Sequence, residues 1–404
     1  MAQPGSGKLL VLGKPTESGE LGTLELARLL PDGTLDNGFG NNGRATSFFD
    51  VGVGRAIADA NGGAFIILTE PSMTSGSFGA ICRLTKGGDL DTNYASGGCR
   101  QVSFPGSTLT SLNSGALQSD GSVILAGFAT SNATGYKQAA LTRITTTGAL
   151  DTGFAASGYF LDSCAGAELA ATTDCALFTV TVTSDRIYAA GEITVNAIDS
   201  DIIVLALTSG GALDNNFHGN GRAVAAFDLT ANVEMHDRGL AVVTSPGGGI
   251  AVGGYAGYAP GPPLLTKAAA AFFDAQGNST GAGTFYLGTS SGYTSRIDVL
   301  ALQGDGKVLL AGTTQTQQAS HLQFAAARIA AGADHHPDTN FGDGTGNGLL
   351  VDFGVADGAA AEATAIAFDG TRPVIAGTRT ATSGDSEFAV IRLTSELIFA
   401  NGFE

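Results

Sequence analysis

The sequence predicts an all-β protein, a β-propeller of four-stranded blades of about 60 residues, and three observations support this fold class. An apolar segment, ending in glycine in six of its seven copies, recurs along the 404 residues. A second segment, in which a turn is followed by Leu-Asp and an aromatic residue, recurs with it. Sixty glycines and only 14% charged residues are typical of short buried strands joined by tight turns.

The first segment sets the period of the chain. Its copies are KLLVLG, AFIILT, SVILAG, RIYAAG, GIAVGG, KVLLAG and RPVIAG, which end at Gly13, Thr69, Gly127, Gly191, Gly254, Gly312 and Gly377. The interval between copies therefore averages about 61 residues, a self-similarity that marks repeat architectures. Apolar residues run through each copy without alternation, which predicts a strand buried on both faces.

The second segment reads LARLLPDGTLDNGFG from Leu26 and recurs, for example, as ICRLTKGGDLDTNY and LTRITTTGALDTGF. We predict that its Asp accepts backbone N–H groups and fixes a turn, in preference to binding calcium. These residues are Asp36, Asp91, Asp151, Asp214 and Asp338. We predict that its aromatic residues pack between blades in preference to stacking on a ligand. They are Phe39, Tyr94, Phe154, Phe217 and Phe341.

Two further strand-like runs lie between successive copies of the second segment. Together with one strand from each repeated segment, they give four strands per repeat. We expect a single domain over 1–404 with seven repeats, the N-terminal one incomplete. The units are approximately 1–40, 41–98, 99–158, 159–221, 222–288, 289–344 and 345–404. Three arrangements remain open: a ring closed over a two-stranded blade, a chain that lacks an upstream half-blade, and six blades with an appended hairpin. An open solenoid is the rival architecture, but it would need capping segments that the sequence does not show.

Charge and hydropathy exclude several classes of partner. The 37 acidic and 20 basic residues give a net charge of −17, which repels nucleic acid phosphates. No stretch approaches eighteen consecutive apolar residues, so we predict no transmembrane segment. The first residues, MAQPGSGKLL, lack a basic region followed by an apolar core, so no signal peptide is visible. We expect a monomer.

The four cysteines indicate an oxidising compartment. Cys164 and Cys175 bracket an insertion found in no other repeat, and this interval predicts a local disulfide. Cys82 and Cys99 lie in or next to strand-like runs, and the sequence leaves their pairing open. A disulfide implies export, so we expect a secreted or cell-surface protein.

These motifs resemble the bacterial delta-60 repeat family, whose unit of about sixty residues is similar to G-K-[IV]-[VL]-[VL]-A-G followed by A-[LI]-x-R-[LY]-x-x-[DT]-G-x-L-D-x-x-F-G. The residues 306–312 and 32–40 match it closely, and the resemblance covers the chain from Lys8 to Phe403. The unit at 250–288 departs most, and Ala206 stands where other copies have arginine. The resemblance implies a propeller-like repeat in exported or surface proteins, and it carries no established catalytic activity that could be transferred to this chain.

One stretch approximates a calcium loop. Asp343, Thr345, Asn347 and Asp352 offer oxygen ligands, but Thr replaces one donor and no bidentate Glu occupies the twelfth position. We expect no cofactor, with Ca²⁺ at this loop as the alternative. The last residues, LIFANGFE, either continue the repeat or form a short C-terminal tail of the kind found on exported proteins.

Loops that follow the first segment vary most between repeats. Equivalent loops of a propeller emerge on one face, so dissimilar loops there either form a binding face or are unconstrained. The candidate contacts are Tyr136, Tyr255, Tyr258 and His321, because aromatic tips supply area at low entropic cost.

The function expected from the sequence is a non-catalytic, secreted or cell-surface binding or structural module for a protein or glycan ligand. The alternative is an extracellular hydrolase or lyase that acts on glycans at a central channel, and a fragment of a larger surface protein is a third possibility. Two or three converging carboxylates with an Arg or His at the channel mouth would favour the enzyme, whereas an uncharged channel with a varied rim would favour binding.

Overall fold

The structure, a computed structural model, describes residues 6–13, 24–46, 54–70, 78–165, 174–196, 199–229, 235–259, 265–316, 321–330, 335, 337–342, 348–351, 360–369, 372–380 and 386–393. Every regular element in these residues is a β-strand. Within that part of the chain there is no helix that could cross a membrane. The chain divides into two compact units, and the predicted single domain stays a prediction.

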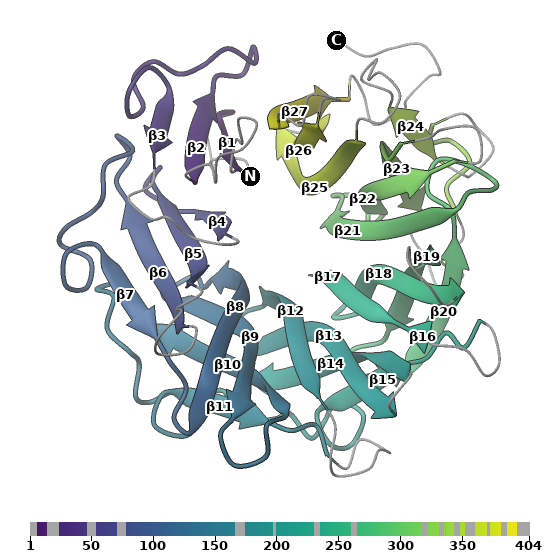
Figure 1. The fold of residues 1–404 in the computed structure, drawn as a ribbon, viewed down its shortest axis with the longest axis horizontal. Coiled ribbons are helices and arrows are strands. Elements are labelled where there is room, and N and C mark those ends of the chain that lie inside the picture. Colours follow the sequence, from purple (N-terminus) through teal and green to yellow (C-terminus); the bar gives the residue numbers. More distant parts are fainter. Residues whose placement is uncertain are drawn as a thin grey trace. The chain divides into compact units, whose positions relative to one another are not determined.

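Unit 1 comprises Met1–Lys14, Gly22–Val195 and Ile203–Ala223. Four antiparallel sheets lie wholly or mainly in it and follow one another in chain order (Figure 1). Their strands are β1 (Leu9–Gly13), β2 (Glu25–Leu29) and β3 (Arg44–Thr46); β4 (Gly54–Ala58), β5 (Ala64–Glu70), β6 (Phe78–Leu84) and β7 (Cys99–Val102); β8 (Ser107–Leu117), β9 (Val123–Ser131), β10 (Lys137–Ile144) and β11 (Tyr159–Asp162); and β12 (Cys175–Val182), β13 (Arg186–Asn196), β14 (Asp199–Thr208) and β15 (Arg222–Ala225).

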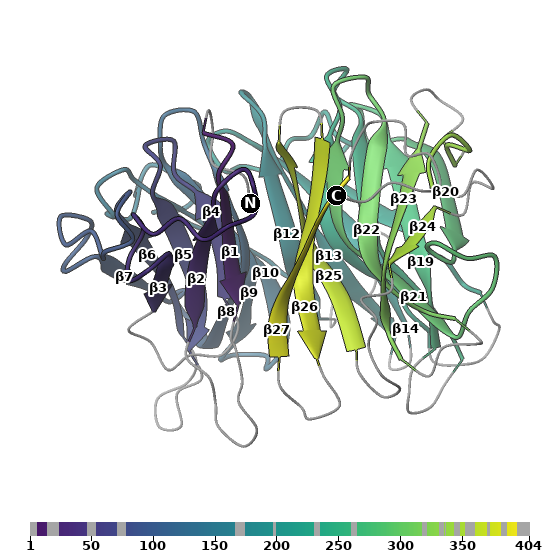
Figure 2. The ribbon, with the colours of Figure 1, turned by 90° about the horizontal axis from the view of Figure 1, so that it is seen from above.

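Unit 2 comprises Pro15–Leu21, Asn196–Ile202 and Val224–Glu404. It holds three more antiparallel sheets, and Figure 2 shows the strands of the last one side by side. Their strands are β17 (Arg238–Thr244), β18 (Ile250–Ala259), β19 (Leu265–Phe273) and β20 (Ser279–Phe285); β21 (Thr294–Leu302), β22 (Val308–Gln315), β23 (Gln323–Ile329) and β24 (Leu349–Val351); and β25 (Ala360–Asp369), β26 (Arg372–Thr380) and β27 (Ser386–Arg392). The two-residue strand β16 (Met235–His236) pairs in parallel with the first residues of β14.

The sheets are offset from the sequence repeats by one strand. In the sheet β21–β24, the fourth strand follows Phe341, which closes the second repeated segment, so the next repeat supplies it. The first sheet consequently has three described strands, β1–β3, and not the two that grouping by repeat gives. The all-strand, four-stranded pattern confirms the predicted β-propeller fold class.

A β-bulge recurs in the first strand of five sheets. Each register shift lies next to the residue that pairs with the glycine of the first repeated segment, as at Ile297/Val299 opposite Gly312. The other shifts are at Leu112/Ser114, Leu177/Thr179, Gly239/Ala241 and Ala363/Ala365. At the bulge a backbone carbonyl oxygen lies against the Cα of the glycine. A Cβ on Gly312 would therefore collide with the Arg296 carbonyl oxygen. The repeat keeps glycine there because no side chain fits.

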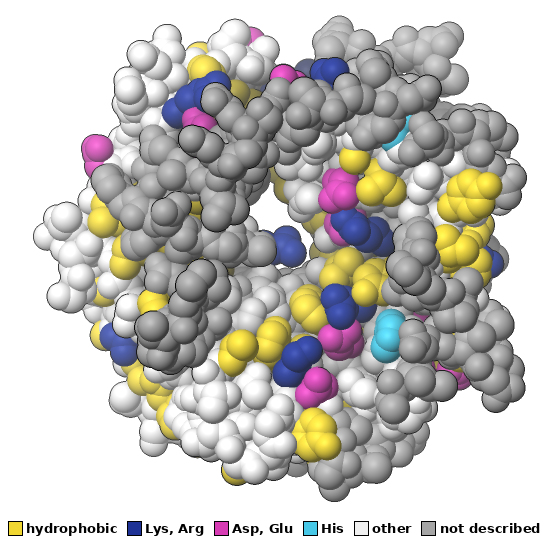
Figure 3. Space-filling view, viewed as in Figure 1, with side chains coloured by type: hydrophobic (Ala, Val, Ile, Leu, Met, Phe, Trp, Pro, Cys, Tyr) yellow, Lys and Arg dark blue, Asp and Glu magenta, His cyan; other side chains and the backbone are white. Residues whose placement is uncertain are grey.

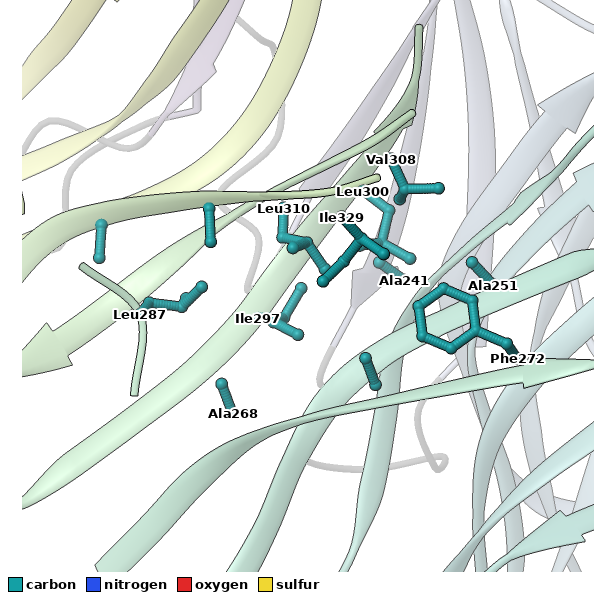
Figure 4. Close-up of a cluster of buried hydrophobic side chains, with 13 residues drawn as sticks. Ala241, Ala251, Ala268, Phe272, Leu287, Ile297, Leu300, Val308, Leu310 and Ile329 are labelled. Atoms are coloured by element: carbon teal, nitrogen blue, oxygen red, sulfur yellow. The ribbon is translucent and has the colours of Figure 1, made fainter. Parts of the chain in front are cut away.

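Apolar side chains fill the spaces between consecutive sheets. Figure 4 shows one such cluster in unit 2, where Phe272 of β19 and Ala251 of β18 meet Ile297 and Leu300 of β21 and Leu310 of β22. Strand β22 is buried along nearly its whole length, as the unalternating pattern of its sequence predicts.

The second repeated segment closes each turn through its Asp and its aromatic residue. Asp36 Oδ1 accepts the N–H of Gly38 at 3.2 Å, and its Oδ2 lies 2.7 Å from Arg28 Nε. The Arg28 guanidinium lies 4.5 Å from the centre of the Phe39 ring, which is 1% exposed. The same Asp and aromatic pattern recurs at Asp338 and Phe341 in unit 2, so the structural roles predicted for both residue types are confirmed.

Two disulfides are present in unit 1. The predicted Cys164–Cys175 bond joins the two ends of the insertion that precedes β12. Cys82 and Cys99, whose pairing the sequence left open, face each other across the strands β6 and β7 and form the second bond. None of the four cysteines is free.

Candidate active site

Two carboxylates meet around one arginine in unit 2. Arg296 and Asp298 lie on β21, and Glu362 lies on β25, the first strand of the next sheet. Arg296 Nε donates to both oxygens of Asp298, at 2.8 and 3.1 Å, and its Nη2 donates to Glu362 Oε2 at 3.1 Å. Acidic and basic side chains accordingly lie next to one another over β21 in Figure 3.

Arg296 and Asp298 stand two residues apart at the β-bulge of β21. Ile297 pairs with Gly312 and Val299 pairs with Ala311. The register shift therefore leaves Asp298 without a paired residue on β22. Bulges re-aim side chains and are over-represented beside active sites. The hydroxyl of Thr313, which is 2% exposed, donates to Asp298 Oδ2 at 3.2 Å and fixes the orientation of the carboxyl.

Sheet packing does not require these charges. At the equivalent bulge of unit 1, Ser111 donates to Asn113, and Asn113 Nδ2 donates to the carbonyl of Leu177 on the next sheet at 2.7 Å. Neutral side chains therefore suffice to bridge two consecutive sheets at this position. Packing of the sheets therefore does not explain why unit 2 has two carboxylates at this position. Clustered carboxylates without a packing role are candidates for a functional site.

Burial gives the two carboxylates different environments. The side chain of Asp298 is 14% exposed, whereas those of Glu362 and Arg296 are 34% and 37% exposed. Burial raises the pKa of Asp298 to about 6, against the opposing effect of the Arg296 guanidinium, and the charge of Glu362 adds to the rise. Asp298 thus titrates near neutrality, as a carboxyl that transfers a proton must.

A group of tyrosines lies in the same unit. Tyr258 donates to the carbonyl oxygen of Tyr293 at 2.9 Å, and Tyr286 donates to Tyr258 at 3.4 Å. Lys267 Nζ lies 5.6 Å from the ring centre of Tyr258. Tyr293 is 48% exposed and precedes Arg296 by three residues in the sequence. An exposed aromatic ring can stack on a sugar.

The four binding candidates predicted from the sequence lie in different places. Tyr136, 42% exposed, is in the β9–β10 turn of unit 1. Tyr255 and Tyr258 are three residues apart on β18 in unit 2, and Tyr255 lies below the Arg238 guanidinium, 5.8 Å from ring centre to Cζ. His321 precedes β23, and both of its ring nitrogens are buried without a hydrogen-bond partner. Of the four, Tyr258 joins the tyrosine group, and the binding role of all four stays a prediction.

The predicted calcium loop lies outside the described residues. Asp343, Thr345, Asn347 and Asp352 all fall in ranges that the structure does not describe, as does the C-terminal segment 394–404.

Sequence reasoning missed Arg296, Asp298 and Glu362. The one available signal is the pair of charges in the strand sequence TSRIDVLAL, since the equivalent strands β8 and β12 have no charged residue. Glu362 is 66 residues further on, and no local pattern connects it with Arg296.

Unit 1 contains a cavity of about 730 Å³ between the turns that follow the first strands of three sheets. Asp59 and Asp120 line it together with Arg83. Asp59 Oδ2 is 2.7 Å from Arg83 Nη2, and Asp120 Oδ1 accepts the hydroxyl of Ser122 at 2.6 Å. Ser122 holds the pKa of Asp120 below its usual value. Both carboxyls are engaged in turns, so the acid and base groups of unit 2 are the better catalytic candidates.

Solved structures similar to this chain include an alpha-L-arabinanase of Penicillium chrysogenum, 9% identical, with a TM-score of 0.46 and 85% of this chain and 94% of that chain covered. An alpha-L-arabinofuranosidase of Fusarium graminearum is 11% identical, with a TM-score of 0.42 and 86% and 94% covered. A protein of unknown function from Dyadobacter fermentans is 12% identical, with a TM-score of 0.43 and 84% and 93% covered. No curated protein matches the chain.

The expectation of a non-catalytic binding or structural module is corrected by the site itself, because two carboxylates converge on Arg296. Converging carboxylates with an arginine are among the features that favour an enzyme.

The repeats themselves match a known family in part. Residues 5–39 and 118–154, which each contain both repeated segments or most of them, match a family described as a domain of unknown function (DUF5122), beta-propeller. Together with the all-strand sheets of both units, this match establishes that the chain is built of β-propeller repeats.

Proposed function

We propose that this chain is an extracellular glycan hydrolase whose general acid is Asp298 and whose second carboxylate is Glu362. The observation that carries the proposal is the pair of carboxylates held by one guanidinium, of which Asp298 has a pKa of about 6. Glycoside hydrolysis requires a carboxyl that is protonated near neutral pH and a second carboxylate.

The proposed reaction uses each group once. Asp298 donates its proton to the glycosidic oxygen as the bond from that oxygen to the anomeric carbon breaks. Glu362 assists the arrival of water at the anomeric carbon, either as a base or as a nucleophile that water later displaces. Arg296 positions both carboxylates, and Tyr293 offers its exposed ring to a sugar.

Release of reducing ends from a panel of polysaccharides, arabinan included, tests the proposal. We expect the wild-type chain to cleave at least one of them, and Asp298→Asn and Glu362→Gln to lower kcat/KM by about 10²-fold or more. Asp89→Asn, at an exposed turn of unit 1, removes the same charge and is the matched control. Thermal unfolding establishes that each variant is folded.

Three results would count against it: no cleavage of any polysaccharide, full activity in Asp298→Asn, or equal loss in Asp89→Asn. If the products instead carry the ultraviolet absorbance of an unsaturated sugar, the enzyme is a lyase and the role given to water is wrong.

We further infer that the chain works outside the cytoplasm and that its repeats are of the delta-60 type. Two disulfides in one chain support the first inference, because cytosolic thiols are kept reduced. The spacing of Arg28, Asp36 and Phe39, whose side chains meet in the structure, supports the second. Mass spectrometry of the exported chain, alkylated with and without prior reduction, tests the first inference, since alkylation without reduction would disprove it.

A further inference from the structure

Three aspartates of unit 2 converge near the start of β14, and none of them is among the residues proposed for catalysis. Asp199 and Asp201 are two residues apart at the start of β14, so their side chains lie on one face of the strand. Asp228 follows β15. One carboxylate oxygen from each of the three lies within 4.8 Å of the others. Ca²⁺ holds oxygen ligands at about 2.3–2.6 Å, so a single ion can reach all three.

A second observation points to a ligand at this cluster. Asp201 is 8% exposed, and its Oδ1 is buried without a hydrogen-bond partner. Asp237 is 2% exposed; its Oδ2 accepts the N–H of Phe227 at 2.7 Å, while its Oδ1 is also buried and without a partner. An unsatisfied buried carboxylate oxygen is costly, and native structures rarely leave one without a reason.

The part of the chain that the structure describes supplies no Lys or Arg to these carboxylates. Among the described residues, neither Lys nor Arg forms an ion pair with any of the four aspartates. A basic group that faces them is His236, whose charge lowers the pKa of Asp199 and whose Nδ1 lies 3.3 Å from Ser200 Oγ. Burial, followed by the charges of neighbouring aspartates, raises the pKa of Asp201 to about 7. Burial likewise raises that of Asp237 to about 7.

We propose that Asp199, Asp201 and Asp228 bind one Ca²⁺ ion, with Asp237 beside it as a further oxygen donor. Every donor in the set is a carboxylate oxygen, which suits a hard cation and disfavours zinc or copper. Ca²⁺ tolerates the irregular geometry of three separate segments better than Mg²⁺, which demands a near-ideal octahedron. The ion neutralises the mutual repulsion of the aspartates.

The proposed ion would tie three stretches of chain together. The start of β14 pairs with β16, and the N–H of Asp237 donates to the Ser200 carbonyl at 2.8 Å. Phe227, next to Asp228, reaches Asp237 through its own N–H. Because the backbone already brings the three stretches together, the site is largely formed before the ion arrives.

Isothermal titration calorimetry of the full chain with Ca²⁺ alone, after treatment with EDTA, tests the proposal. We expect one site with a dissociation constant of about 10⁻⁶ to 10⁻³ M and a rise in Tm when Ca²⁺ is added. Asp201→Asn and Asp228→Asn should each weaken binding by about tenfold or more, whereas the exposed control Asp89→Asn should bind as the wild type does.

A crossover in stability provides an independent readout. Without Ca²⁺, Asp201→Asn should unfold at or above the Tm of the wild type, because it removes a repelling charge. With Ca²⁺ in excess, it should unfold below the wild type. Absence of a calorimetric signal in the wild type, or binding that persists in Asp201→Asn and is lost in Asp343→Asn, would overturn the proposal, and the latter would place the ion at 343–352.

Discussion

Arg186 Nε lies 2.7 Å from Asp214 Oδ2, and this contact replaces one that the repeat loses. In three other copies the arginine stands eight residues before the aspartate, as Arg143 does before Asp151 at 2.6 Å. In this copy Ala206 occupies that position, and the guanidinium arrives from the start of β13 on the neighbouring strand. The aspartate keeps its partner although the local motif is broken.

Arg186→Met should destabilise the chain by about 2 kcal/mol, because it leaves Asp214 buried without its cation. Urea unfolding would measure the loss. Ala206→Arg in the same chain rebuilds the arrangement of the other copies, and we expect it to recover part of the stability. Equal stability of Arg186→Met and wild type would show that the ion pair contributes nothing.

Gly312→Ala should cost about 1–3 kcal/mol, because its Cβ would collide with the Arg296 carbonyl oxygen. The matched control is Gly304→Ala, whose Cβ would have no atom within 4 Å and which should change stability little. Since the collision displaces the bulge that carries Asp298, the first variant should also lose hydrolytic activity. Loss of stability in Gly304→Ala of the same size would contradict this explanation.

The pH dependence of unfolding should reveal Asp298. Burial raises its pKa from 3.8 to about 6, so the folded chain holds a proton that the unfolded chain releases between these values. The free energy of unfolding therefore decreases as the pH rises from 3.8 to about 6, by about 3 kcal/mol at most. Urea unfolding of wild type and Asp298→Asn across this range should show the decrease in the wild type and a smaller one in the variant.

The titration of Asp298 should also appear in the pH dependence of hydrolysis. A general acid acts in its protonated form, so hydrolysis should decline as the pH rises above about 6. Activity that increases through this range would exclude Asp298 as the acid.

Tyr293→Ala should raise KM for a polysaccharide by about tenfold with little change in stability, since the ring is 48% exposed. Tyr293→Phe retains the ring and should behave as the wild type does. Steady-state kinetics separates the two variants, and an identical KM for Tyr293→Ala would remove this tyrosine from the proposed site.

Removal of the Cys164–Cys175 disulfide by a double Cys→Ala substitution should cost about 2–3 kcal/mol, as expected for a sequence separation of 11. Thermal unfolding with and without reductant would measure it. Unchanged Tm after removal would show that the insertion contributes no stability through this bond.

The sequence by itself determined what depends on neighbouring residues. The unalternating apolar runs specify strands such as β22, the Asp after each turn accepts a nearby N–H, and the insertion places Cys164 close to Cys175. All of these depend on short stretches of chain, where spacing along the sequence limits spacing in space.

Only the tertiary structure decided which distant residues meet. The outer strands β7, β11, β15 and β24 come from the repeat that follows the rest of their sheet, and the pairing of Cys82 with Cys99 depends on the register of β6 and β7. Arg296 reaches Glu362 across 66 residues because two consecutive sheets pack at their first strands. Sequence alone fixes neither packing nor register between sheets, so the candidate active site could be recognised only after folding had brought its charges together.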